Sequence, residues 1–148
     1  MKINKLNDIN AICFGGMVFM YGNMQVIAEK STEHTVVYKN SGADSFCDES
    51  QEIKLDKGIF DDLIDVIEHI EIETQPSEED NVLIAIEKKE ETGAYEWFVA
   101  LLDKNEEVIM QISGYNYEDN AFKLISAELS KKCSEFGCIE KFFTSVNE

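Results

Sequence analysis

AICFGGMVFMY (residues 11–21) and MQVIAEK (residues 24–30) decide the fold, because both stretches are apolar and β-prone on the two faces of an extended chain. Between them lie Gly22 and Asn23, residue types that favour hairpin turns. We therefore expect residues 9–30 to form an antiparallel hairpin. It would begin an N-terminal β-meander.

The meander should continue through two short strands, residues 35–39 and 52–55, with the polar stretch NSGADSFCDES (residues 40–50) as the loop between them. Three further strands are expected at residues 82–88, 95–102 and 108–113. Their turns, Thr92-Gly93 and residues 103–105, are short enough for neighbouring strands to pair antiparallel. Residues 139–146 are apolar and β-prone, and we expect them to form a last strand that closes the sheet.

Two segments have helical rather than alternating spacing. Residues 56–71 place Phe60, Leu63, Ile64, Ile67 and Ile70 on one apolar stripe, with Asp56 as the expected cap, and the helix should end before Pro76. A second helix is expected over residues 118–136, with Asn116 as its cap candidate and Gly137 after its last turn. Its buried stripe would carry Phe122, Ile125, Leu129, Cys133 and Phe136.

The order of these elements is typical of the α+β class. We expect one globular domain over residues 1–148, in which an antiparallel sheet of about six to eight strands, arranged as two meanders, packs against two amphipathic helices. A chain of 148 residues buries enough apolar surface to fold without disulfides or metal.

The chain is strongly acidic, with 30 carboxylate residues against 13 basic ones and a net charge of −17. All the basic residues are lysines, so the planar guanidinium clamps that bind phosphate are missing. This charge excludes direct binding to nucleic acid and to anionic membranes, and no stretch approaches the roughly 20 apolar residues of a membrane span. Four cysteines without a convincing export signal indicate a reducing compartment, which we expect to be the cytoplasm.

The negative charge is concentrated in residues 56–80, where ten carboxylates accompany a single lysine, Lys57. A helix that needed only solubility would interleave lysine, because like charges four residues apart repel. We therefore predict that this segment docks against a basic partner, while a merely solvated helix face remains the simpler interpretation. The predicted partner-binding residues are Asp61, Asp62, Asp65, Glu68, Glu71, Glu73, Glu78, Glu79 and Asp80, and Trp97 or Tyr95 would supply an apolar anchor.

The sequence supports neither a metal nor another cofactor. Asp65 and His69 have the spacing to share a divalent ion with Asp61 or Asp62, but this spacing recurs by chance in acidic helices. Cys133 and Cys138 lack the paired motif of a zinc site, and we expect Cys13 and Cys133 to be core residues. No nucleophile elbow or phosphate loop is present, so we do not expect an enzyme.

In size, acidity and α+β pattern, the whole chain resembles the immunity proteins that neutralise bacterial toxins. That resemblance implies a basic protein partner, such as a toxin or nuclease domain, which the acidic protein covers after electrostatically steered association. Two alternatives remain. One is a phage-type nucleic-acid mimic that inhibits a restriction or CRISPR effector. The other is a small enzyme with a carboxylate-based site.

Overall fold

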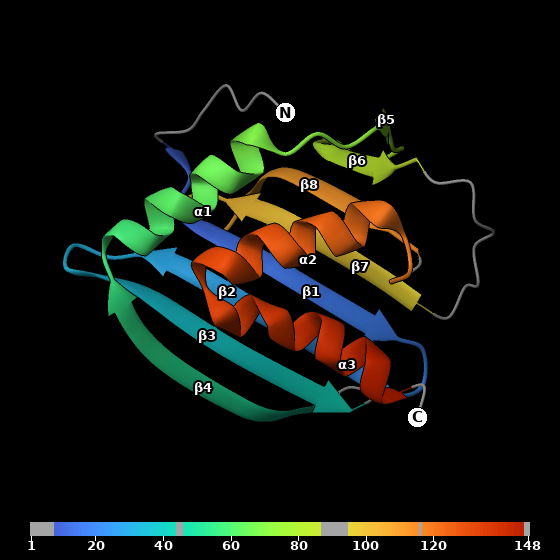
Figure 1. Cartoon of the computed structure of the whole chain (residues 1–148), viewed down its shortest axis with the longest axis horizontal. Coiled ribbons are helices and arrows are strands. Elements are labelled where there is room, and N and C mark those ends of the chain that lie inside the picture. Colours follow the sequence, from blue (N-terminus) through green and yellow to red (C-terminus); the bar gives the residue numbers. More distant parts are fainter. Residues whose placement is uncertain (1–7, 44–45, 87–94, 116, 147–148) are drawn as a thin grey trace.

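The residues that the structure describes form one eight-stranded sheet with three α-helices on a single face, an α+β architecture (Figure 1). The computed structural model describes residues 8–43, 46–86, 95–115 and 117–146. The strand order is β4-β3-β2-β1-β7-β8-β6-β5. The predicted class is confirmed, but the sheet packs against three helices rather than two.

The first half of the sheet is the expected meander, but the predicted position of its first turn is wrong. The meander comprises β1 (Ala11–Val18), β2 (Gly22–Lys30), β3 (His34–Ala43) and β4 (Phe46–Asp56), each antiparallel to the next. Residues 19–21 join β1 to β2, whereas Gly22 and Asn23 pair with β1 as part of β2. The expected loop over residues 40–50 is wrong for most of its length, because β3 and β4 extend into it and pair Asn40 with Ser50. Polar side chains do not prevent this, since the ladder bonds come from the backbone.

The second half comprises β5 (Thr74–Pro76), β6 (Val82–Ala85), β7 (Tyr95–Leu102) and β8 (Val108–Gly114). β7 pairs antiparallel with β8, as predicted, and its other edge pairs with β1. The expected antiparallel pairing of β6 with β7 is therefore wrong, because both edges of β7 are taken; β6 instead lies parallel to β8. The expected turn Thr92-Gly93 lies outside the described residues. The short edge strand β5 was not predicted, and its Pro76 is tolerated at an edge.

The helices are α1 (Gly58–His69), α2 (Asn120–Lys132) and α3 (Cys138–Val146), with a 3₁₀ turn, Ser134–Gly137, between the last two. The strand predicted over residues 139–146 is wrong, because this segment is α3. Its aromatic and β-branched residues favour a strand by composition, but Ile139 and Phe143 are four apart and both are fully buried. The second helix is also shorter than expected, since α2 ends at Lys132.

The first turn of α1 is capped from another element. The Thr35 hydroxyl, on β3, accepts a hydrogen bond from the Phe60 backbone N–H at 3.0 Å and donates one to the Lys57 carbonyl at 3.2 Å. Asp56, the expected cap, is instead the last residue of β4. The other predicted cap, Asn116, lies outside the described residues, and α2 begins directly after Asp119.

The core lies between the sheet and the helices. Phe14 on β1 and Trp97 on β7 both contact Phe122 of α2, with ring centroids 5.6 and 5.8 Å apart, and Phe122 meets Phe143 of α3 at 5.4 Å. Because strand side chains alternate between faces, the neighbours of Phe14 and Trp97 point to the opposite face, which no helix of the described residues covers (Figure 1). We call this the open face.

Candidate protein-binding surface

The predicted acidic helix face exists. In α1 the residues Phe60, Leu63 and Ile67 are buried against the sheet, whereas Asp61, Asp62 and Asp65 are exposed and Glu68 is half-buried. The helix contains no lysine, so its solvent side carries carboxylates without an interleaved positive side chain. Such a surface attracts cations over roughly a Debye length.

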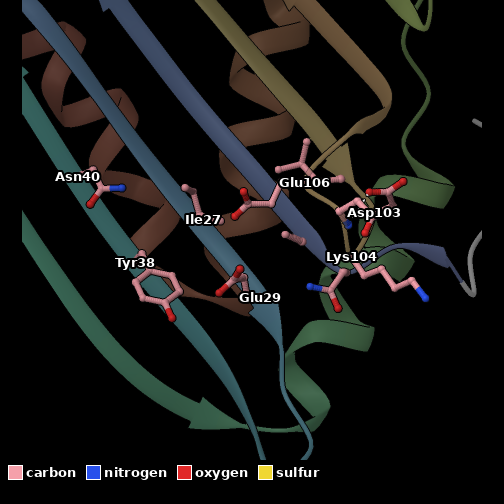
Figure 2. Close-up of a pocket in the computed structure, with 11 residues that line it drawn as sticks. Ile27, Glu29, Tyr38, Asn40, Asp103, Lys104 and Glu106 are labelled. Atoms are coloured by element: carbon pink, nitrogen blue, oxygen red, sulfur yellow. Dashed lines mark hydrogen bonds between the residues drawn. The ribbon is translucent and has the colours of Figure 1, made fainter. Parts of the chain in front are cut away.

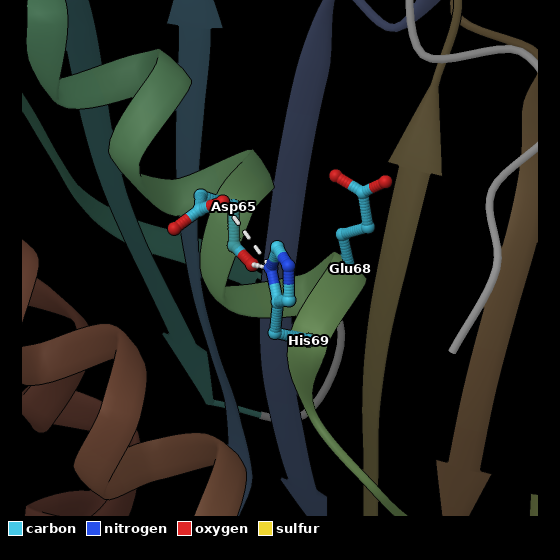
Figure 3. A group of neighbouring side chains, drawn as sticks. All are labelled: Asp65, Glu68 and His69. Carbon is cyan, nitrogen blue, oxygen red and sulfur yellow. Dashed lines mark hydrogen bonds and ion pairs between the residues drawn. The ribbon is translucent and has the colours of Figure 1, made fainter.

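Asp65 and Glu68 gather with His69 at the C-terminal end of α1 (Figure 3). The Asp65 carboxylate lies 3.2 Å from His69 Nδ1, which also contacts the Asp65 backbone oxygen at 2.8 Å. The backbone contact and the carboxylate raise the pKa of His69 above its ordinary value. A protonated His69 would therefore partly offset the negative charge at this end of the helix.

Asp65, Glu68 and His69 could each offer one ligand atom to a metal ion, since these atoms lie within 4.8 Å of one another. However, His69 Nδ1 already contacts Asp65. The side chains of His69 and Asp65 are 72% and 70% exposed. Ordered metal sites hold their ligands with further hydrogen bonds. The group is best described as an ion pair on a solvated helix end.

The remaining predicted residues do not join the α1 face. Glu71 and Glu73 are exposed in the segment that leads from α1 to β5, and Glu78, Glu79 and Asp80 lie in the turn between β5 and β6. That turn is held by Ser77, whose hydroxyl accepts a hydrogen bond from the Glu79 backbone N–H at 3.1 Å. It lies at the edge of the sheet, beyond the end of α1 (Figure 1). The nine residues thus form a helix group and a sheet-edge group.

The structure adds a second acidic region on the open face, which sequence reasoning missed. A hollow of about 600 Å³, the Glu29 hollow, lies over β2, β3 and the β7–β8 turn (Figure 2). Its walls carry the carboxylates of Glu29, Asp103 and Glu106 together with Tyr38 and Lys104. The lining carboxylates outnumber the one lysine, so the hollow is suited to a cationic group.

Hydrogen bonds hold Asp103 in place at one wall of the Glu29 hollow. Asp103 accepts hydrogen bonds from the backbone N–H groups of Asn105 at 2.8 Å and Glu107 at 3.0 Å, which fixes the turn. On the opposite wall, the pKa of the Tyr38 phenol is raised by desolvation and then by the carboxylates of Glu29 and Glu52. Tyr38 therefore stays a neutral hydrogen-bond donor beside these carboxylates.

A second hollow of about 470 Å³, the Glu96 hollow, lies on the same open face beside the β5–β6 turn. It is lined by Glu78, Glu79 and Glu96, with Tyr115 and Gln111 among its other walls. Two of the predicted residues, Glu78 and Glu79, therefore belong to the open face. α1 lies on the covered face.

Sequence reasoning missed Glu29, Glu96, Asp103 and Glu106 because they are dispersed along the chain and reach one face only through strand pairing. The alternation of side chains along the strands was the available signal. Glu29 lies two residues after Ile27, and Glu96 two residues before Phe98, so each pair of side chains lies on one face of its strand. Identifying the face also requires the strand order, which β-pairing across the molecule determines.

The predicted aromatic anchor is wrong for Trp97. This side chain is 0% exposed and packs in the core, where a Cβ atom on Gly114 would lie 2.3 Å from its indole ring. Tyr95 is half-buried, with its ring 5.3 Å from that of Tyr117. Large exposed apolar side chains are found instead at Met17, Phe19, Met20 and Tyr21.

In the part of the chain that the structure describes, none of the helices is long and apolar enough to cross a membrane. Comparison with models of known protein families gives no match, and no curated protein or solved structure shows significant similarity to the chain.

Proposed function

We propose that this protein binds a basic protein partner and blocks its activity, as an immunity protein blocks its cognate toxin. The observation that carries the proposal is the solvent side of α1, where Asp61, Asp62, Asp65 and Glu68 stand on a lysine-free helix. A face of one sign accelerates association with an oppositely charged protein by roughly 10- to 1,000-fold at low salt. A nuclease-like toxin fits, because its own site is basic in order to bind nucleic acid.

The acidic hollows of the open face support the same kind of partner. Their carboxylates line concave surfaces, which can receive lysine or arginine side chains, whereas the α1 face is convex. Charge–charge contacts of this kind add specificity and association rate more than affinity.

A nucleic-acid mimic is the second candidate, and one observation favours it. The carboxylates are not restricted to α1 but also occur on the opposite, open face, as an effector that encloses a duplex would require. A mimic would compete with duplex DNA or RNA for its target, whereas an immunity protein would bind a target that need not hold a duplex.

The test is capture from the native host with the immobilised protein, at low salt and followed by elution with salt. The baits are the wild-type chain, a helix-reversal variant (Asp61→Lys, Asp65→Lys and Glu68→Lys) and a control variant (Asp8→Lys, Glu33→Lys and Glu140→Lys) with the same change in net charge. All three control residues are exposed and lie off the solvent side of α1.

We expect one basic protein to be retained by the wild type and the control, to be lost with the helix-reversal variant, and to be inhibited by the wild-type chain. Capture of the same set of basic proteins by wild type and helix-reversal variant alike would contradict the proposal. Competition by added duplex DNA would favour the mimic.

A further inference from the structure

The end of β1 and the turn that joins it to β2 expose an unusual set of apolar side chains. Met17 is 43% exposed, Phe19 65%, Met20 78% and Tyr21 65%. Three other large hydrophobic side chains are exposed in the described residues. Ile86 and Leu124 line one small hollow with Glu71 and Glu73, and Val108 lies on β8. We call residues 17–21 the hairpin tip. Clustered exposed aromatic and methionine side chains mark interaction sites, because water contact with them is unfavourable.

The needs of the fold do not explain this composition. The β1–β2 ladder runs in register to Val18 and Gly22, and the Tyr21 N–H donates to the Val18 carbonyl at 2.9 Å, so the tip is an ordered turn. Within it Met20 has a φ of 69°, in the left-handed region that glycine and asparagine adopt more readily. In the β5–β6 turn the corresponding conformation, φ 65°, is taken by Asn81. Both the strain and the exposure at Met20 cost stability, and such a combination points to function.

The tip adjoins the acidic open face. Met17 lies opposite Glu96 in the β1–β7 register, and the two side chains share that face. Glu96 in turn lines the Glu96 hollow with Glu78 and Glu79. An apolar projection is therefore bordered by carboxylates, which a partner would match with an apolar pocket rimmed by lysine or arginine.

The same charges argue against two other occupants. A second copy of the chain would bring two net charges of −17 together and place Glu96 near its own counterpart. An anionic membrane would repel the border of the tip for the same reason.

We infer that the hairpin tip is the apolar anchor of the partner complex, inserting Phe19, Met20 and Tyr21 into an apolar pocket of the basic protein. This inference rests on the proposed function and assigns association and dissociation of the complex to two different regions. The carboxylates of α1 set the association rate through long-range attraction, and the tip sets the dissociation rate through buried apolar contact.

The first test places the photo-crosslinking residue benzoylphenylalanine at position 20, and at exposed position 33 as a control, in the full-length chain expressed in its native host. Illumination should join position 20, but not position 33, to the same basic protein that salt elutes, with the adduct mapped to apolar residues of that protein. Adducts only with a second copy or with lipid, or no adduct, would overturn the inference.

The second test measures dissociation of the isolated complex. The tip variant is Phe19→Ser, Met20→Asn and Tyr21→Ser, and its control is Val108→Ser, which removes an exposed apolar group from β8, away from the hairpin tip. The tip variant should dissociate about 100-fold faster with an association rate within about threefold of wild type. The control should match wild type, and the thermal unfolding midpoint of the tip variant should not fall, because Asn suits a positive φ.

Dissociation of the tip variant within twofold of wild type would overturn the anchor, even if the helix-reversal variant still loses association. A helix-reversal variant that associates as fast as the wild type would instead remove the proposed function itself. The two failures are therefore distinguishable.

Discussion

At the scale of single residues, Thr35 shows how a side chain far away in the sequence begins a helix. Its hydroxyl joins the first turn of α1 from β3, with the Phe60 N–H as donor and the Lys57 carbonyl as acceptor. Thr35 is fully buried and its hydrogen bond with the Phe60 N–H is buried, so this N–H gains no water when the hydroxyl is removed.

We therefore expect Thr35→Val, which keeps the shape and removes the hydroxyl, to lower the free energy of unfolding by about 1–3 kcal/mol. Urea denaturation measures the change. Thr35→Ser, which retains the hydroxyl, should lose clearly less. Equal stability of Thr35→Val and wild type would show that the cap contributes nothing.

The cysteines give a second prediction at this scale. Cys13 and Cys133 are buried, as predicted, and desolvation raises the pKa of each thiol to about 12; the Glu135 carboxylate adds to the effect at Cys133. At pH 8 both remain neutral thiols, and only thiolates are nucleophilic.

Iodoacetamide at pH 8 should therefore label half-buried Cys138 in the native protein and leave Cys13 and Cys133 unmodified until denaturant is added. Peptide mass mapping identifies the labelled sites. Rapid native labelling of Cys13 would contradict its burial.

The pKa of His69 gives a third prediction at the residue scale. Its pKa is raised first by the backbone contact with Asp65 and then by the Asp65 carboxylate, so Asp65→Asn should lower the pKa without abolishing the backbone part of the rise. A raised folded-state pKa stabilises the fold below the unfolded value of about 6.5, and this contribution is lost as pH rises through the folded value. NMR titration of the imidazole measures the pKa of His69 in the wild type and in Asp65→Asn. An unchanged pKa in Asp65→Asn would exclude the ion pair.

At the scale of elements, close packing through glycine joins the helices to the sheet. A Cβ atom at Gly16, on β1, would lie 2.4 Å from the Phe143 ring of α3, while a Cβ atom at Gly58, in α1, meets nothing within 4 Å. The two positions form a matched pair, because one is filled by an aromatic ring and the other is open.

Gly16→Ala should therefore destabilise the fold by about 1–3 kcal/mol, since α3 must move away from β1. Gly58→Ala should leave stability unchanged or raise it by up to about 1 kcal/mol, because alanine favours the helix. Denaturant unfolding of the two variants tests this contact between elements; equal effects would contradict the docking of α3 on β1.

The elements also show what local sequence can establish. The β1–β2 hairpin and α1 are predictable because apolar patterning acts within a few positions. The predicted turn Gly22-Asn23 is nevertheless wrong, because both residues pair within the β1–β2 ladder and residues 19–21 form the turn. The composition of the α3 segment predicts a strand, because it is β-prone and only the four-residue spacing of its buried residues indicates a helix. The parallel pairing of β6 with β8 is not local, because it follows from β1 occupying the other edge of β7.

At the scale of the whole molecule, the carboxylates occupy two faces. The helix group of the candidate site was predictable, because Asp61, Asp65 and Glu68 are close in sequence. The open face was not, because Glu29, Glu96 and Asp103 come from different strands and turns that meet only in the folded sheet. The hairpin tip is an apolar projection beside this face. It gives the acidic molecule a surface for apolar contact in addition to its electrostatic attraction.

The central claim is that α1 steers the chain onto a basic protein, and association kinetics test it most directly. The rate for the isolated partner should fall steeply as salt rises from about 10 mM to about 500 mM, over which the Debye length shrinks from about 30 Å to a few Å. With Asp61→Lys, Asp65→Lys and Glu68→Lys the low-salt rate should fall at least tenfold and lose most of its salt dependence, whereas the Asp8→Lys, Glu33→Lys and Glu140→Lys control should lose much less. Equal rates and equal salt slopes for the two reversed variants would contradict the account.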